Sequence, residues 1–117
     1  MKQKNEVLEL SFQFALDIIK YTASLEKSKK YIIANQLIKS GTSIGANISE
    51  AQSAESRTDF IHKLKIASKE AAETAYWLKL CSLQPDYPQN TNLEDSLASI
   101  QRLLTKIIVS SKNQENR

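Results

Sequence analysis

The sequence has few of the residues that end helices, form tight turns or hold cofactors. Its 117 residues include two glycines, two prolines, one cysteine and one histidine. So few turn-forming residues, without alternation of β-branched and polar positions, predict a single all-α domain. A lone cysteine cannot form an internal disulfide, which favours a reducing cytoplasm. No apolar run approaches the length of a membrane-spanning helix, and we expect no signal peptide.

The same scarcity argues against an enzyme. Asp59 and His62 have the carboxylate-x-x-histidine spacing of di-iron helical bundles, but the chain has no second histidine to complete such a site. Cys81 ends an apolar seam, where a thiol usually packs in the core. Neither glycine is followed by the Lys-Ser/Thr pair of a phosphate-binding loop. We therefore expect no catalytic residue, no metal and no cofactor.

Apolar residues that recur every three or four positions indicate four amphipathic helices. They are predicted over residues 6–25, 28–52, 56–81 and 92–110. Ser56 and Asp59 resemble a capping box at the start of the third helix. Pro85 and Pro88 lie in the only long linker. Short connections make successive helices antiparallel, so the predicted fold is an up-down-up-down four-helix bundle.

The first predicted helix carries two apolar stripes about 100° apart around its axis. They are Leu8, Phe12, Ala15 and Ile19 on one side, and Phe14, Ile18, Tyr21 and Leu25 on the other. A helix so broadly apolar is either deeply buried or contacts another subunit. We favour the second reading and predict a subunit interface through Phe14, Ile18 and Tyr21.

Both glycines fall inside the second predicted helix and share one face. Each costs roughly 1 kcal/mol relative to alanine in a helix interior. In one reading the helix continues through Gly41 and Gly45, which let the third helix approach closely. In the other reading, Gly41 caps a shorter helix. We predict the continuous helix, with the glycines setting the distance between the second and third helices.

One flank of the third predicted helix mixes charged groups with Ile66 and Trp77. Either Trp77 covers the end of the core, or this flank is a subunit contact whose charges set the register. Both readings stay open, and Ile66 and Trp77 are candidate interface residues. Several polar groups are predicted to fix register within or between subunits. These are Asn47, Glu50, Lys63, Glu70 and Glu73.

The basic residues suggest a binding function. The chain has a net charge of +3. Lys65 and Lys69 share the outer face of the third helix, and Arg102 and Lys106 stack on the fourth. Repeated around a symmetric oligomer, these four residues would form a positive surface that holds phosphate backbones without reading sequence. The prediction is a non-enzymatic oligomeric scaffold that binds RNA, DNA or a nucleic-acid-processing protein. The alternative is a protein-interaction module without nucleic-acid binding.

Two segments carry a family resemblance. IANQLIK at residues 33–39, followed by SIxxNIxEA at 43–51, resembles the signature of bacterial four-helix-bundle proteins encoded in intervening sequences of 23S rRNA genes. Residues 56–78 are similar to a subgroup of that family. The resemblance implies a ring-shaped homopentamer. A related protein is the accessory variability protein of diversity-generating retroelements, which resembles a basic barrel that binds a reverse transcriptase and nucleic acid.

Overall fold

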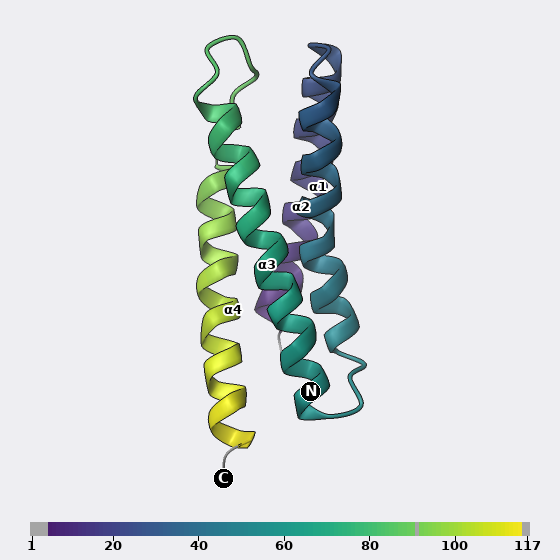
Figure 1. Ribbon diagram of the computed structural model, residues 1–117, viewed down its shortest axis with the longest axis vertical. Coiled ribbons are helices and arrows are strands. Elements are labelled where there is room, and N and C mark those ends of the chain that lie inside the picture. Colours follow the sequence, from purple (N-terminus) through teal and green to yellow (C-terminus); the bar gives the residue numbers. More distant parts are fainter. Residues whose placement is uncertain (1–4, 91, 116–117) are drawn as a thin grey trace.

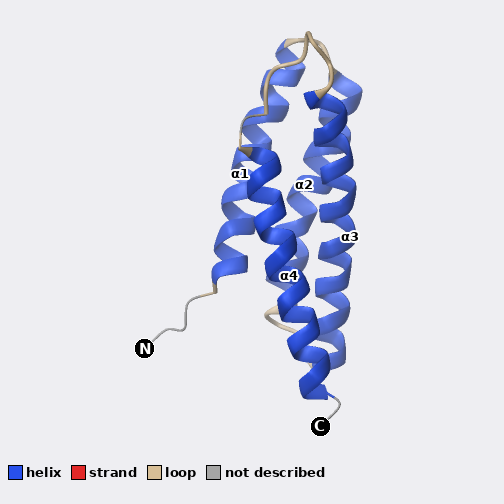
Figure 2. Ribbon diagram, turned by 90° about the vertical axis from the view of Figure 1, so that its left-hand side faces the viewer, coloured by secondary structure: helices blue, strands red, loops and turns tan. Residues whose placement is uncertain are grey.

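Four antiparallel helices form a closed bundle in the computed structural model, which describes residues 5–90 and 92–115 (Figure 1). They are α1 (Glu6–Lys27), α2 (Tyr31–Ala51), α3 (Arg57–Ser82) and α4 (Leu93–Glu115). Each helix packs against the next, and α4 lies between α1 and α3 (Figure 2). The described residues contain no strand, and the bundle measures 52 × 27 × 20 Å. The predicted all-α bundle is confirmed.

The helix ends follow local hydrogen bonding. The Leu8 N–H donates to Asn5 Oδ1 at 3.2 Å, and the Asp59 N–H donates to Ser56 Oγ at 3.0 Å, so the predicted cap at Ser56 is confirmed. The predicted start of α2 near residue 28 is wrong. Lys29 has a positive φ of 63°, and the Lys30 N–H donates to the Leu25 carbonyl, so these residues close α1 instead. Helix α4 also continues five residues beyond its predicted end.

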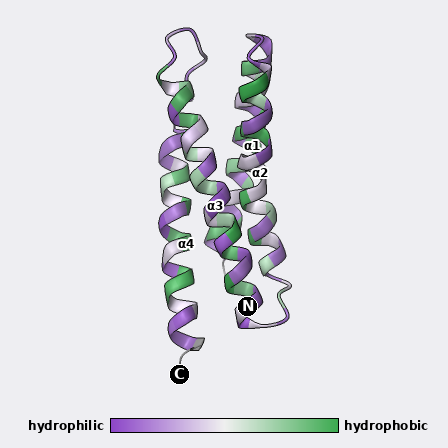
Figure 3. Ribbon diagram, in the orientation of Figure 1, coloured by the Kyte–Doolittle hydropathy of each residue, from purple (hydrophilic) through white to green (hydrophobic). Residues whose placement is uncertain are grey.

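The core consists of one apolar side of each helix. Hydrophobic and hydrophilic residues alternate along all four helices (Figure 3). The largest buried side chains are Phe14, Ile18 and Leu25 from α1, Leu37, Ile44 and Ile48 from α2, Leu64 and Leu78 from α3, and Leu97, Ile100 and Leu104 from α4. The buried Thr74 hydroxyl hydrogen bonds with Ser40 Oγ at 2.9 Å and with the Glu70 carbonyl at 2.7 Å. The α2–α3 contact therefore includes a satisfied polar pair within the core.

The structure reverses the roles predicted for the two stripes of α1. Phe14, Ile18 and Tyr21 are buried within the subunit, so their prediction as subunit-interface residues is wrong. The Tyr21 hydroxyl donates to the Pro88 carbonyl at 2.8 Å, which gives the polar end of this side chain a partner inside the protein. The exposed stripe is the other one, where Phe12 is 67% and Ile19 47% exposed. Periodicity alone gives two apolar stripes but does not say which one faces the core.

The glycines of α2 face α1 instead of α3. Helix α2 runs unbroken through Gly41 and Gly45, and no glycine has a positive φ, so the continuous helix is confirmed and the capping alternative is wrong. A Cβ at Gly41 would lie 3.0 Å from side-chain carbons of Ile18, and one at Gly45 would lie 3.3 Å from the Ser11 carbonyl oxygen. The missing side chains therefore set the approach of α1 to α2, which corrects the predicted role at the α2–α3 contact.

Candidate nucleic-acid interface

One part of the α3–α4 hairpin carries only positive charges. Residues 60–69 of α3 and 96–114 of α4 contain no Asp or Glu, whereas they contain six Lys or Arg residues. These are Lys63, Lys65, Lys69, Arg102, Lys106 and Lys112. All but Lys63, which is half-buried, are exposed. An exposed segment with one sign of charge is the electrostatic signature expected of a surface that contacts phosphates.

One hydrogen bond joins α3 to α4, and a second joins α3 to the linker that precedes α4. The Arg57 guanidinium donates to Gln114 Oε1 near one end of the hairpin, and Asn90 Nδ2 donates to the Leu78 carbonyl at 3.1 Å near the other. Because the helices are antiparallel, residues equally far from the Arg57–Gln114 bond lie at the same height.

The four predicted basic residues therefore lie at two matching heights along the α3–α4 hairpin. Lys65 and Lys106 each lie eight residues from the Arg57–Gln114 bond, or about 12 Å at 1.5 Å per residue. Lys69 and Arg102 each lie twelve residues from it, or about 18 Å. We call Lys65, Lys69, Arg102 and Lys106 the α3–α4 basic surface. Its members were predicted from the sequence, but their matching heights follow only from the helix register.

Three cations of this surface have no acidic partner among the described residues. Two salt bridges join Lys30 to Asp86 at 3.5 Å and Lys63 to Glu50 at 3.1 Å. Lys69, Arg102 and Lys106 take part in neither. Arg102 Nη2 donates to the neutral Ser99 Oγ, at 3.1 Å. These three positive charges are thus available to an external anion.

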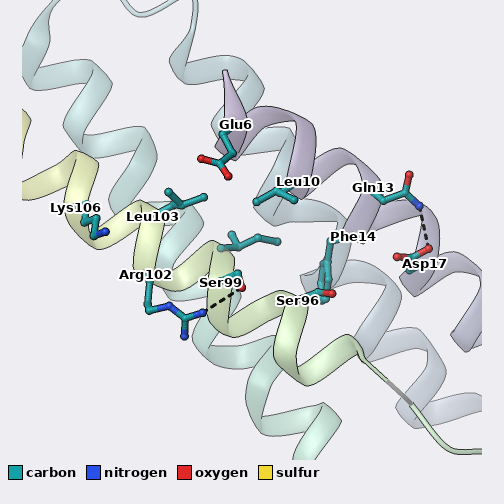
Figure 4. A pocket seen from close by; sticks show the side chains of 11 residues that line it. Glu6, Leu10, Gln13, Phe14, Asp17, Ser96, Ser99, Arg102, Leu103 and Lys106 are labelled. Carbon is teal, nitrogen blue, oxygen red and sulfur yellow. Dashed lines mark hydrogen bonds between the residues drawn. The ribbon is translucent and has the colours of Figure 1, made fainter. Parts of the chain in front are cut away.

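A groove between α1 and α4 borders the basic surface (Figure 4). Its volume is about 340 Å³, and Arg102 and Lys106 line its α4 side. The α1 side carries Glu6 and Asp17, and the Asp17 carboxylate accepts a hydrogen bond from Gln13 Nε2 at 3.0 Å. Carboxylates repel a polyanion, so we expect a nucleic acid to lie on the α3 side of Arg102 and outside this groove.

The polar residues predicted to fix register act mostly within their own helices. Asn47 Nδ2 donates to the Ser43 carbonyl at 2.8 Å, and Trp77 Nε1 donates to Glu73 Oε2 at 3.1 Å. Glu70 supplies a backbone carbonyl to Thr74. The Glu50–Lys63 salt bridge is the one of these contacts that crosses between helices, joining α2 to α3. This pair supports a register role inside the subunit.

The two interface candidates on α3 are half-buried. Trp77 packs against the edge of the hydrophobic core and contacts the ring of Tyr76 edge-on, with ring centroids 5.2 Å apart. This placement agrees with the reading in which Trp77 covers the core. For Ile66 the subunit contact stays a prediction.

The titratable side chains of the described residues form no cluster that could hold a metal ion. No three His, Cys, Asp or Glu side chains within residues 5–90 and 92–115 lie together as metal ligands, and His62 is exposed. Burial raises the pKa of the Cys81 thiol, which disfavours the reactive thiolate. Burial also raises the pKa of Tyr21, with the neighbouring Cys81 as a further cause. None of the helices in these ranges is long and apolar enough to cross a membrane.

A second surface is apolar. We call it the α1–α2 face: Leu8, Phe12, Ala15 and Ile19 from α1 with Thr42 and Ala46 from α2. All but Ile19 line a hollow of about 590 Å³, together with Gly45 and the polar residues Glu9, Ser11 and Ser49. Contiguous exposed apolar groups of this kind commonly mark protein–protein contacts.

Sequence reasoning overlooked Tyr76. Tyr76 is 59% exposed and lies seven residues from Lys69. Seven residues are close to two helical turns, so the two side chains leave α3 on the same side. The seven-residue spacing between Lys69 and Tyr76 is visible in the sequence and could have identified Tyr76 as part of the basic face.

Comparisons with known proteins agree with this fold. The family model described as 23S rRNA-intervening sequence protein matches residues 3–108. A crystal structure of a protein of unknown function from the S23 ribosomal protein family of Bacteroides thetaiotaomicron is 42% identical, with a TM-score of 0.83. The match covers 87% of this chain and 97% of that one. Among curated proteins none matches. Because the family model spans nearly all of the sequence, the chain belongs to the 23S rRNA-intervening sequence protein family.

Proposed function

We propose that this protein is a non-enzymatic, cytoplasmic oligomeric scaffold that binds nucleic acid, or a partner that processes nucleic acid, through the α3–α4 basic surface. The observation that carries the proposal is the acid-free part of the α3–α4 hairpin, where two pairs of exposed basic residues stand at matching heights.

Such a surface suits the phosphate backbone. Lysine and arginine side chains bind phosphates through charge and displace condensed counterions, which makes the affinity fall as salt is added. Backbone contacts position a nucleic acid without distinguishing its bases. Since the net charge is only +3, the local concentration of basic residues matters more than the charge of the whole chain. We therefore expect binding with little sequence preference.

Self-association would multiply these contacts. The α1–α2 face leaves Phe12 and Ile19 largely exposed, and a second copy of the chain is the partner we propose for it. The family resemblance implies a homopentamer. In a ring, five basic surfaces would act on one nucleic acid, and linked sites bind more tightly than separate ones.

Salt-dependent binding tests the proposal. Fluorescence anisotropy with labelled RNA or DNA should show binding at low salt that weakens as salt rises. The variant Lys69→Gln/Arg102→Gln should bind less tightly, and its log–log salt slope for a single strand should be smaller by about 1.4, or roughly 0.7 for each phosphate that it no longer neutralises. Lys20→Gln/Lys39→Gln removes two exposed charges from α1 and α2 and is the matched control. No binding at low salt would refute the proposal.

The alternative is a protein-interaction module, which the α1–α2 face favours. In that case a specific protein partner should remain bound after nuclease treatment. Replacing Phe12 should release that partner, whereas replacing Lys69 and Arg102 should leave it bound.

A further inference from the structure

The outer side of α3 places an aromatic ring in line with lysines. Lys65, Lys69, Ala72 and Tyr76 follow one another at spacings of four, three and four residues, and all four are exposed. Residues at these spacings lie on one face of a helix. The stripe therefore continues the α3–α4 basic surface as far as Tyr76.

The ring of Tyr76 is supported from one side only. Its centroid lies 5.2 Å from that of Trp77, with the ring planes at 68°. Trp77 is itself held, because it packs against the core and its Nε1 donates to Glu73 Oε2 at 3.1 Å. Tyr76 nevertheless remains 59% exposed. An ordered ring that is open to solvent is a surface on which a flat base can stack.

The charges near Tyr76 indicate the direction in which a bound strand would run along α3. Asp95 lies nineteen residues from Gln114, and Tyr76 lies nineteen from Arg57, so Asp95 is level with Tyr76 on α4. Glu94 adjoins Asp95. On α3 the exposed Glu73 lies between Lys69 and Tyr76, where it accepts the Trp77 hydrogen bond, and the exposed Lys79 follows Tyr76 by three residues. Lys69 and Lys65 form the basic end of the stripe, so phosphates should run from Tyr76 towards them.

The stripe has the length of a short strand. Tyr76 and Lys65 are eleven residues apart, or about 16 Å along α3. That distance spans about five nucleotides at a rise of roughly 3.4 Å per nucleotide. The small side chain of Ala72 leaves the space between the ring and Lys69 open.

We infer that this outer face of α3 binds single-stranded nucleic acid, with one base stacked on Tyr76 and the following phosphates on Lys69 and Lys65. The inference rests on the proposed function and narrows its ligand to a single strand. In a duplex the bases are already paired and stacked, so they offer no free face to Tyr76. A single strand presents its bases and its phosphates together.

The test compares the affinities of the parent protein and two Tyr76 variants for single-stranded and duplex RNA. Anisotropy is measured with an oligouridine of about ten nucleotides, twice the expected footprint, and with an RNA duplex of equal length. Tyr76→Leu keeps an apolar side chain but removes the ring, and Tyr76→Phe restores it. We expect Tyr76→Leu to weaken oligouridine binding by about 5- to 150-fold, the loss of one base–aromatic stack, and to leave duplex binding unchanged. Tyr76→Phe should bind within about twofold of the parent protein, since the stack remains.

The fluorescence of Trp77 tests whether the nucleic acid contacts Tyr76. Trp77 is the only tryptophan and touches Tyr76, so its fluorescence should change when oligouridine binds to the parent protein or to Tyr76→Phe. Unchanged oligouridine affinity in Tyr76→Leu would overturn the stacking site while leaving the proposed function intact. Absence of binding to either RNA and to DNA at low salt would overturn both. If light scattering shows that Tyr76→Leu alters the oligomer, Tyr76 contacts protein and the inference fails.

Discussion

The close approach of α1 to α2 can be tested at Gly41. An alanine here gains about 1 kcal/mol of helix propensity over glycine. Its Cβ, however, would lie 3.0 Å from two carbons of Ile18, and Ile18 is fully buried. Overpacking of this kind costs about 1–3 kcal/mol. We therefore expect Gly41→Ala to destabilise the protein by about 0–2 kcal/mol.

The effect of Gly41→Ala on stability should change from destabilising to stabilising when the Ile18 side chain is removed. Ile18→Ala deletes all three carbons near Gly41 and alone should cost about 2–5 kcal/mol. In that background Gly41→Ala has space and should stabilise by about 1 kcal/mol. The coupling energy between the two sites is then about 1–3 kcal/mol, equal to the overpacking cost.

Urea unfolding of the four proteins at one concentration measures this cycle. Gly45→Ala is the control, because a Cβ there meets Ser11 and not Ile18. Its effect should add to that of Ile18→Ala within about 0.5 kcal/mol. Additive effects of Gly41→Ala and Ile18→Ala would refute the packing described for the α1–α2 pair.

Two further predictions concern α1. Phe12→Ser, on the exposed stripe, should reduce self-association in light scattering without lowering monomer stability, whereas an unchanged oligomer would exclude the α1–α2 face as the interface. Tyr21→Phe removes the hydroxyl that donates to the Pro88 carbonyl and should cost about 1 kcal/mol in urea unfolding. The pKa of Tyr21 is raised from its ordinary value of 10.0, so the unfolded state loses this proton first as pH rises. Stability should then fall above about pH 10, and less steeply in Tyr21→Phe; equal slopes would contradict this reading.

Much of the fold was predictable because it depends on local patterns. Apolar spacing gave four helices, and Ser56 marked the start of α3. The choice between the two stripes of α1 failed because both are apolar. The decisive clue was the small Ser11, which is buried against Gly45 and allows close contact on that side. Such a complementary pair is recognised only when two helices are considered together.

Some features of the candidate nucleic-acid interface could likewise be predicted from the sequence, and others could not. Exposure of Lys65, Lys69, Arg102 and Lys106 was predictable from helix periodicity, and all four are exposed. Their matching heights on α3 and α4 depend on a register that is set by contacts between helices, such as that of Arg57 with Gln114. No pattern within one helix contains that information.

The order of the bundle has a consequence for how it forms. The contacts of α1 with α2, α2 with α3 and α3 with α4 all join segments adjacent in the chain, while α1 with α4 joins its two ends and is the smallest contact. Local contacts lower the entropy lost in closing loops and favour rapid folding. We therefore expect the contact between α1 and α4 to form last. In hydrogen exchange, the facing amides of α1 and α4 should open before those between α2 and α3.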